Sequence, residues 1–162
     1  MTTSEYNHCV RELADGLYRF ACKSIGDCEE AKDMVQQAFT ILWEKKEEVQ
    51  ADKGKSFLYT VTYRKCMDVH RARERLTDTE HMHENFLSQQ PTTSNDLKKI
   101  LQKALSLLDN QSRNLVMLKD YEGYSYEEIG KVTGLNTTQV KVYLHRARKT
   151  LKNYLVSKEH VI

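Results

Sequence analysis

The spacing of apolar residues most constrains how this chain can fold. Near the N-terminus, Val10, Leu13, Leu17 and Phe20 follow one another at intervals of three and four residues, which places them on one face of an α-helix. No run of alternating apolar and polar residues is long enough to predict a strand. The pattern therefore predicts an all-α protein. At 40% hydrophobic and 30% charged residues, the chain can form ordinary cores and lacks the composition of a disordered protein.

The helical pattern is interrupted around the only proline, Pro91, because Thr77 to Asp96 shows no sustained apolar period. Such a segment is typical of a linker. We therefore expect two small helical domains, spanning residues 1–76 and 97–162, joined by a flexible linker over 77–96.

The first domain is expected to contain three helices. In the second of these, Ala31, Val35, Ala38 and Leu42 repeat at helical spacing. A third helix is expected over Ser56 to Arg75, where it combines aromatic and basic residues. Aromatic rings can stack on unpaired bases while cations hold the backbone, although aromatic residues at helical spacing also commonly belong to a core.

The second domain contains signals for a helix-turn-helix. Ser125 and Glu128 form a capping box, which predicts the start of a helix. That helix is expected to end at Gly134, because glycine adopts the left-handed conformation at low cost. Asn136 can then cap a longer helix, with Gln139 at its third position. A short helix, a glycine turn and a long helix is the arrangement that places a recognition helix in the major groove.

The stretch Thr137 to Leu155 contains six basic or histidine residues and no acidic residue. Its apolar stripe, expected to be buried, consists of Val140, Leu144, Ala147, Leu151 and Leu155. The outer N-terminal part of this helix is the part that reaches base edges, and the basic residues that follow are suited to phosphates. We therefore interpret the stretch as a DNA-binding helix rather than a solvated charged one.

Cys9, Cys22, Cys28 and Cys66 form no CxxC pair and are expected to be reduced and mostly buried. No segment resembles a signal peptide or approaches the roughly 20 apolar residues of a membrane span. The protein is therefore expected to be cytoplasmic, without membrane insertion and without a cofactor.

Three stretches together resemble the sigma-70 factors of bacterial RNA polymerase, in the group called extracytoplasmic function (ECF) sigma factors. EEAKDMVQQAFTILWEK resembles the family's regions 2.1 to 2.2, and KSFLYTVTYRKCMDVHRARER resembles regions 2.3 and 2.4. LSLLDNQSRNLVMLKDYEGYSYEEIGKVTGLNTTQVKVYLHRARKTL resembles region 4. The resemblance implies a transcription initiation factor and not an enzyme.

The resemblance also implies three sets of site residues and their partners. Core RNA polymerase, through the clamp helices of its largest subunit and its flap, would meet the first set: Asp33, Gln36, Gln37, Phe39 and Trp43. The −10 element of promoter DNA would meet Lys55, Ser56, Phe57, Tyr59, Tyr63, Arg64, Asp68 and Arg71. The −35 element would meet Ser125, Thr137, Thr138, Lys141, Val142, His145, Arg146, Arg148 and Lys149. An anti-sigma factor is expected to hold the protein inactive.

One departure from the family pattern has a structural meaning. The proline usual at the start of region 4 is replaced by Asp109, which can cap a helix.

Two other interpretations stay open. The last 60 or so residues would equally suit a stand-alone helix-turn-helix regulator. A metal-binding enzyme would need His81 and His83, with His8 and Cys9, as ligands, but two histidines two residues apart in a polar segment are a weak signal.

Overall fold

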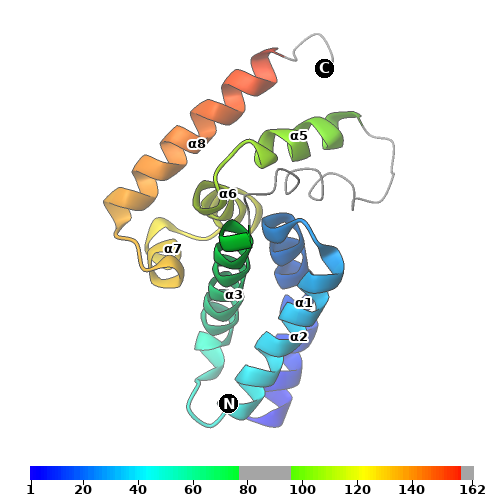
Figure 1. Ribbon diagram of the computed structural model, residues 1–162. Helices are drawn as coiled ribbons and strands as arrows, with labels where there is room; N and C mark the ends of the chain where they lie inside the picture. Colours follow the sequence, from blue (N-terminus) through cyan, green and yellow to red (C-terminus); the bar gives the residue numbers. More distant parts are fainter. Residues whose placement is uncertain (77–95, 158–162) are drawn as a thin grey trace.

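The computed structural model describes residues 1–76 and 96–157. Every element assigned within these two ranges is a helix, which confirms the all-α class (Figure 1). Most of the predicted linker, including His81 and His83, lies outside the described residues. The exact domain boundaries stay a prediction.

The N-terminal half is a bundle of three long helices that lie side by side (Figure 1). Its elements are α1 (Thr3–Ile25), α2 (Cys28–Glu44), the short 3-10 helix η1 (Ala51–Lys53) and α3 (Gly54–Leu76). Thr2 caps α1 through a capping box with Glu5, and Asp27 caps α2 by accepting two backbone N–H groups. The third helix is slightly longer than the predicted Ser56 to Arg75 because Gly54 and Leu76 continue its helical turns.

The C-terminal half contains the predicted helix-turn-helix. Its elements are α5 (Asp96–Ser106), α6 (Asn110–Val116), the π-helical turn η2 (Met117–Tyr121), α7 (Tyr126–Thr133) and α8 (Thr137–Ser157). The capping box of Ser125 and Glu128 is present at the start of α7, and Gly134 ends it with a φ of 81°. Asn136 and Gln139 bond reciprocally at the start of α8, at 3.0 and 2.8 Å. These local predictions are confirmed.

Asp109 caps α6 as the sequence predicts, since its Oδ1 accepts the backbone N–H of Ser112 at 2.7 Å. The stripe that seats α8 is confirmed for its first three residues, Val140, Leu144 and Ala147, which are buried. Leu151 and Leu155 are only partly buried. Figure 1 shows the reason, because the last turns of α8 extend away from the bundle.

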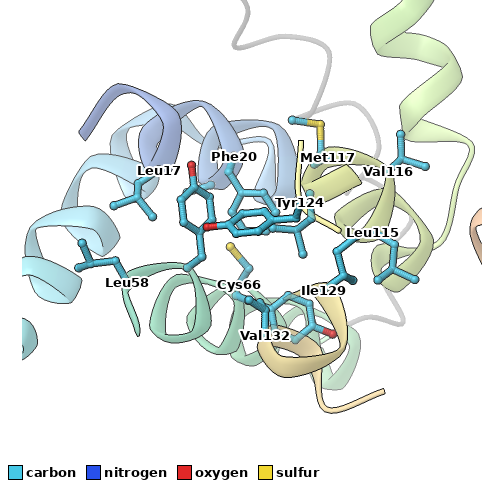
Figure 2. Packing of buried hydrophobic residues seen from close by; sticks show 14 of the residues in the cluster. Leu17, Phe20, Leu58, Cys66, Leu115, Val116, Met117, Tyr124, Ile129 and Val132 are labelled. Atoms are coloured by element: carbon cyan, nitrogen blue, oxygen red, sulfur yellow. The ribbon is translucent and has the colours of Figure 1, made fainter. Parts of the chain in front are cut away.

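The two halves pack directly on each other, mainly through α3 and α7. The ring of Tyr59 on α3 meets that of Tyr124, just before α7, edge to face with centroids 5.1 Å apart. Tyr59 also meets the ring of Phe20 of α1 edge to face, with centroids 5.9 Å apart. Tyr59 and Tyr124 are 2% and 3% exposed, and Figure 2 shows Phe20 and Tyr124 among the residues of the buried cluster. The aromatic contact therefore forms part of one core shared by both halves.

A glycine and an ion pair border this aromatic contact. Gly16 on α1 admits the Tyr59 hydroxyl group, which would lie only 2.6 Å from a Cβ at that position. Arg19, one turn further along α1, donates from Nη2 to both carboxylate oxygens of Glu122 at 2.8 and 2.9 Å. The Glu122 side chain is 7% exposed and that of Arg19 is 45% exposed. The pair therefore joins the halves at the edge of their apolar contact.

A second polar contact lies at the C-terminal end of α1. The Ser24 hydroxyl donates to Asn114 Oδ1 of α6 at 2.5 Å and lies 3.2 Å from His70 Nε2 of α3. Because the Ser24 proton goes to Asn114, His70 Nε2–H is the donor in the second bond. Burial lowers the pKa of His70 to about 3, helped by the positive charges of Arg113 and Arg73. His70 is therefore neutral in this structure.

The cysteines correct a prediction. Cys22 and Cys28 form a disulfide between the end of α1 and the start of α2, with Cα atoms 4.7 Å apart. Cys9 and Cys66 are free and buried, as expected, and burial raises the pKa of Cys66 to about 12. The expectation of four reduced cysteines is wrong for the pair that the α1–α2 turn brings together, because six residues of sequence separation conceal that proximity.

The depressed pKa of His70 predicts an acid-sensitive fold. Above about pH 6.5 the imidazole is neutral in both folded and unfolded protein, so the free energy of unfolding is unaffected. Between about pH 6.5 and about pH 3 only the unfolded chain takes up the proton. The free energy of unfolding should therefore fall by about 1.4 kcal/mol per pH unit from this group. Urea titrations from pH 7 to pH 5 should show that His70→Gln removes this part of the slope.

The exposed His145 on α8 provides the matched control, and His145→Gln should keep the slope. Identical pH profiles for His70→Gln and the unsubstituted protein would contradict the assignment.

Candidate nucleic-acid interface

The outer face of α8 is open to solvent where the sequence predicts base contacts. Thr138, Lys141, Val142 and His145 are exposed, and Thr137 is partly exposed. Val142 keeps 41% of its surface accessible, although exposure of an apolar side chain to water does not stabilise the fold. Such a side chain can meet the methyl group of a thymine in the major groove. The predicted base-reading residues thus share one accessible face.

The basic residues of α8 differ in how firmly they are held. Arg148 donates to Asp120 at 2.8 Å, and this bond raises the pKa of the guanidinium. Lys141 Nζ lies 5.4 Å from the centroid of the Tyr126 ring at the start of α7, within reach of a cation–π interaction. Arg146 and Lys149 are exposed. The arrangement presents positive charge along α8 for phosphate contacts.

Ser125 differs from the predicted −35 residues of α8, because its side-chain oxygen is already hydrogen-bonded within the protein. Its hydroxyl accepts the backbone N–H of Glu128 at 3.1 Å, so its oxygen is engaged in the capping box of α7. Its role toward DNA stays a prediction.

The structure separates the predicted −10 residues of α3 into two groups. Lys55, Arg64, Asp68 and Arg71 are exposed, and Ser56 and Phe57 are partly exposed. Tyr59 and Tyr63, by contrast, are 2% and 6% exposed, because the C-terminal half covers them. Lys55 also reaches across the halves, with Nζ 4.8 Å from the Tyr124 centroid. In this arrangement neither tyrosine can stack on a base.

The accessible part of α3 borders a groove with the preceding loop. The groove is lined by Glu48, Val49, Gln50, Lys53, Ser56, Phe57, Thr60 and Arg64. It combines two cations, an aromatic ring and several hydrogen-bonding side chains, which suits an unpaired nucleotide. Sequence reasoning missed five of these residues: Glu48, Val49, Gln50, Lys53 and Thr60. The spacing of Ser56, Thr60 and Arg64 at intervals of four could have indicated Thr60, whereas the loop residues carry no periodic signal.

The predicted polymerase-binding residues also fall into two groups. Asp33, Gln36 and Gln37 line an open groove between α2 and α3, where Lys65 Nζ donates to Gln37 Oε1 at 2.9 Å. The groove also contains Thr40, Ile41 and Glu44, which the sequence interpretation missed although they continue the same helical face. Polar residues around a partly apolar groove are typical of a protein-binding surface.

Phe39 and Trp43 lie instead toward the start of α1. The Tyr6 hydroxyl donates to the Phe39 carbonyl at 2.9 Å, and the Tyr6 and Trp43 rings meet at 5.0 Å. Trp43 is still 43% exposed, and the Lys46 ammonium lies 4.5 Å from its centroid. These two aromatic residues therefore do not line the groove of Asp33 and Gln37, and their role in polymerase binding stays a prediction.

Among residues 1–76 and 96–157, no three histidine, cysteine or carboxylate side chains are grouped so as to hold a metal ion. His81 and His83, the basis of the metal-enzyme alternative, fall outside these ranges. None of the described helices is both long and apolar enough to span a bilayer.

Comparison with known protein families matches both halves of the chain. The family model for sigma-70 region 2 matches residues 9–76, and that for sigma-70 region 4 matches residues 98–151. The second match includes the helix-turn-helix, and the first includes the groove of Asp33 and Gln37.

Characterised relatives extend over nearly the whole chain. The ECF RNA polymerase sigma factor SigE of Mycolicibacterium smegmatis is 30% identical over 159 residues, covering 93% of this chain and 61% of SigE. The RNA polymerase sigma factor SigV of Bacillus subtilis is 26% identical over 152 residues, covering 93% of this chain and 91% of SigV. This chain thus spans 61% of the first relative, which is less than two thirds, but most of the second.

Two solved structures share the fold. The sigma factor RpoE of Bartonella quintana, in complex with the anti-sigma factor NepR, matches with a TM-score of 0.80 at 22% identity, covering 94% of this chain and 98% of RpoE. CnrH, in complex with the cytosolic domain of CnrY, matches with a TM-score of 0.69 at 22% identity, covering 94% of this chain and 88% of CnrH. With both region models matched in order on an all-helical chain, this protein belongs to the sigma-70 family, in its ECF group, whose members are transcription initiation factors and not enzymes.

Proposed function

We propose that this protein binds core RNA polymerase and directs it to specific promoters. The observation that carries the proposal is the exposed face of α8, with Lys141, Val142 and His145 accessible, on a helix-turn-helix that belongs to sigma-70 region 4. α8 would read the −35 element. The accessible part of α3 and its groove would contact the −10 element, and the groove of Asp33 and Gln37 would meet the polymerase clamp helices.

We further propose that reading both elements requires the two halves to separate. Elements named −10 and −35 lie about 25 base pairs apart, or roughly 85 Å along duplex DNA at about 3.4 Å per base pair. α8, with 21 residues, is only about 31 Å long, and α7 packs directly on α3. The packed halves therefore hold the two proposed DNA-contacting helices, α3 and α8, too close together for that distance. Separation would also expose Tyr59 and Tyr63, the two predicted −10 residues that are now buried.

An anti-sigma factor is the third proposed partner. Both structural neighbours are bound to another protein, RpoE to the anti-sigma factor NepR and CnrH to the cytosolic domain of CnrY. The likeness in fold makes a similar partner reasonable for this chain.

The function is tested by run-off transcription with core polymerase on genomic fragments. We expect discrete initiation sites only when both protein and core polymerase are present. Tight, specific binding of the protein alone to duplex DNA, without initiation, would instead favour a stand-alone helix-turn-helix regulator.

Substitutions on α8 should separate base reading from phosphate binding. Lys141→Ala and His145→Ala should change the preference among −35 sequences by about 1–3 kcal/mol, because they remove side chains that face base edges. Lys152→Ala, further along the same exposed helix, should weaken all promoters alike and reduce the salt dependence by about one phosphate contact. The measurement is run-off transcription from a library of −35 variants at several salt concentrations. A uniform loss for Lys141→Ala and His145→Ala would show that neither reads sequence.

Weakening the contact between the halves should strengthen promoter complexes. Glu122→Gln removes the charge that Arg19 binds across the halves, and a half-exposed ion pair is worth at most about 1 kcal/mol. If complex formation draws on a small population of separated molecules, the apparent Kd should fall roughly fivefold. Titration of the protein into core polymerase and a fixed promoter measures this change.

Glu29→Gln is the matched control, because Glu29 pairs with Lys32 within α2 and not across the halves. Equal apparent Kd values for the two variants would argue against separation as a step before promoter binding.

A further inference from the structure

The disulfide of Cys22 and Cys28 occupies a position at which the two halves meet. Three consecutive residues beside Cys22 contact other elements. Lys23 Nζ lies 4.3 Å from the centroid of the Tyr121 ring in η2, and Ser24 donates to Asn114 of α6. The carbonyl of Ile25 accepts from Arg73 of α3. Two of these contacts join the N-terminal bundle to the C-terminal half.

The two sulfurs have different electrostatic surroundings. Cys28 is the first residue of α2, a helix of 17 residues whose dipole favours negative charge at this end, although Asp27 already accepts the N–H groups of Glu29 and Glu30 there. Cys22 lies in the last turn of α1, where the opposite end of a helix disfavours negative charge. Cys28 is also partly exposed, whereas Cys22 is only 7% exposed. Cys28 is therefore the sulfur that an oxidant would reach first.

We propose that Cys22 and Cys28 form a redox-active dithiol whose disulfide form holds the two halves of the protein together. The proposal rests on the proposed function, because a protein that works with RNA polymerase is exposed to the conditions of the cytoplasm. There thiols are kept reduced, and the disulfides that do form are usually transient and redox-sensing.

The reaction needs a hydroperoxide as the oxidant. The Cys28 thiolate attacks the outer oxygen of ROOH, the O–O bond breaks, and alkoxide or hydroxide leaves and takes a proton to give the alcohol or water. Cys28 is then a sulfenic acid. The Cys22 thiol attacks that sulfur, the S–S bond forms, and the sulfenic hydroxyl leaves with the Cys22 proton as water. Two electrons pass from the two thiols to the peroxide, and a thiol reductant reverses the step.

The bond affects the interface because it closes a short loop. Cys22 and Cys28 are the two ends of the segment that contains Lys23, Ser24 and Ile25. A cross-link between the ends fixes the last turn of α1 against the start of α2, in the position from which Lys23 and Ser24 reach η2 and α6. Separation of the two halves is then less favourable in the oxidised protein. The oxidised protein should therefore keep its halves packed together, and the halves of the reduced protein should separate more readily.

The chemistry is tested on the full chain without polymerase. Reduced protein is treated with hydrogen peroxide, and a dione reagent captures sulfenic acid before peptide mass mapping. We expect Cys22→Ser to accumulate a captured sulfenic acid on Cys28, and Cys28→Ser to show none on Cys22. Cys9→Ser, at a buried free cysteine, should form the same disulfide as the unsubstituted chain. Capture mainly on Cys22, or no disulfide between the pair, would overturn the proposal.

The effect on the interface is tested by run-off transcription with untreated core polymerase after the peroxide is removed. We expect the oxidised protein to transcribe at least fivefold less than the reduced protein at limiting concentration, with recovery after dithiothreitol. Cys28→Ser should be insensitive to peroxide and as active as the reduced protein. A disulfide that forms without changing transcription would overturn the proposal. An inactive reduced protein would instead show that the proposed function itself is wrong.

Discussion

The burial of Tyr59 between Phe20 and Tyr124 is the contact on which the arrangement of the two halves depends. It places an aromatic ring of each half in a shared core, and edge-to-face pairs of this kind stabilise beyond their buried area. The same ring is one that a sigma factor of this family is expected to offer to the −10 element. Under the proposed function, burial of Tyr59 between the halves and its contact with DNA would therefore compete for one side chain.

Polar groups border that apolar contact and add to the free energy that holds the two halves together. The Arg19–Glu122 pair and the bonds of Ser24 to Asn114 and His70 each contribute modest free energy. The Cys22–Cys28 bond borders the same segment of α1. Separation of the halves, as proposed above, would have to break these polar contacts together with the aromatic one.

Much of the local structure could be predicted from short-range signals. The capping box at Ser125, the left-handed Gly134 and the cap at Asp109 depend on residues within a few positions of each other, so sequence is sufficient. The exposed face of α8 followed from helical periodicity in the same way. Periodicity could not tell whether Tyr59 and Tyr63 face solvent or a second module, since an aromatic residue suits both environments.

The sequence by itself determined the all-helical class, the helix-turn-helix and the accessible basic face of α8, because caps and helical spacing act within one or two turns. Only the tertiary structure decided that α7 covers α3, that Phe39 and Trp43 lie away from the groove of Asp33, and that Cys22 meets Cys28. Those outcomes depend on which apolar surfaces bury one another across long sequence separations. The sequence of a single helix does not determine which surfaces pack together, because each apolar face is compatible with several partners until the whole core is packed.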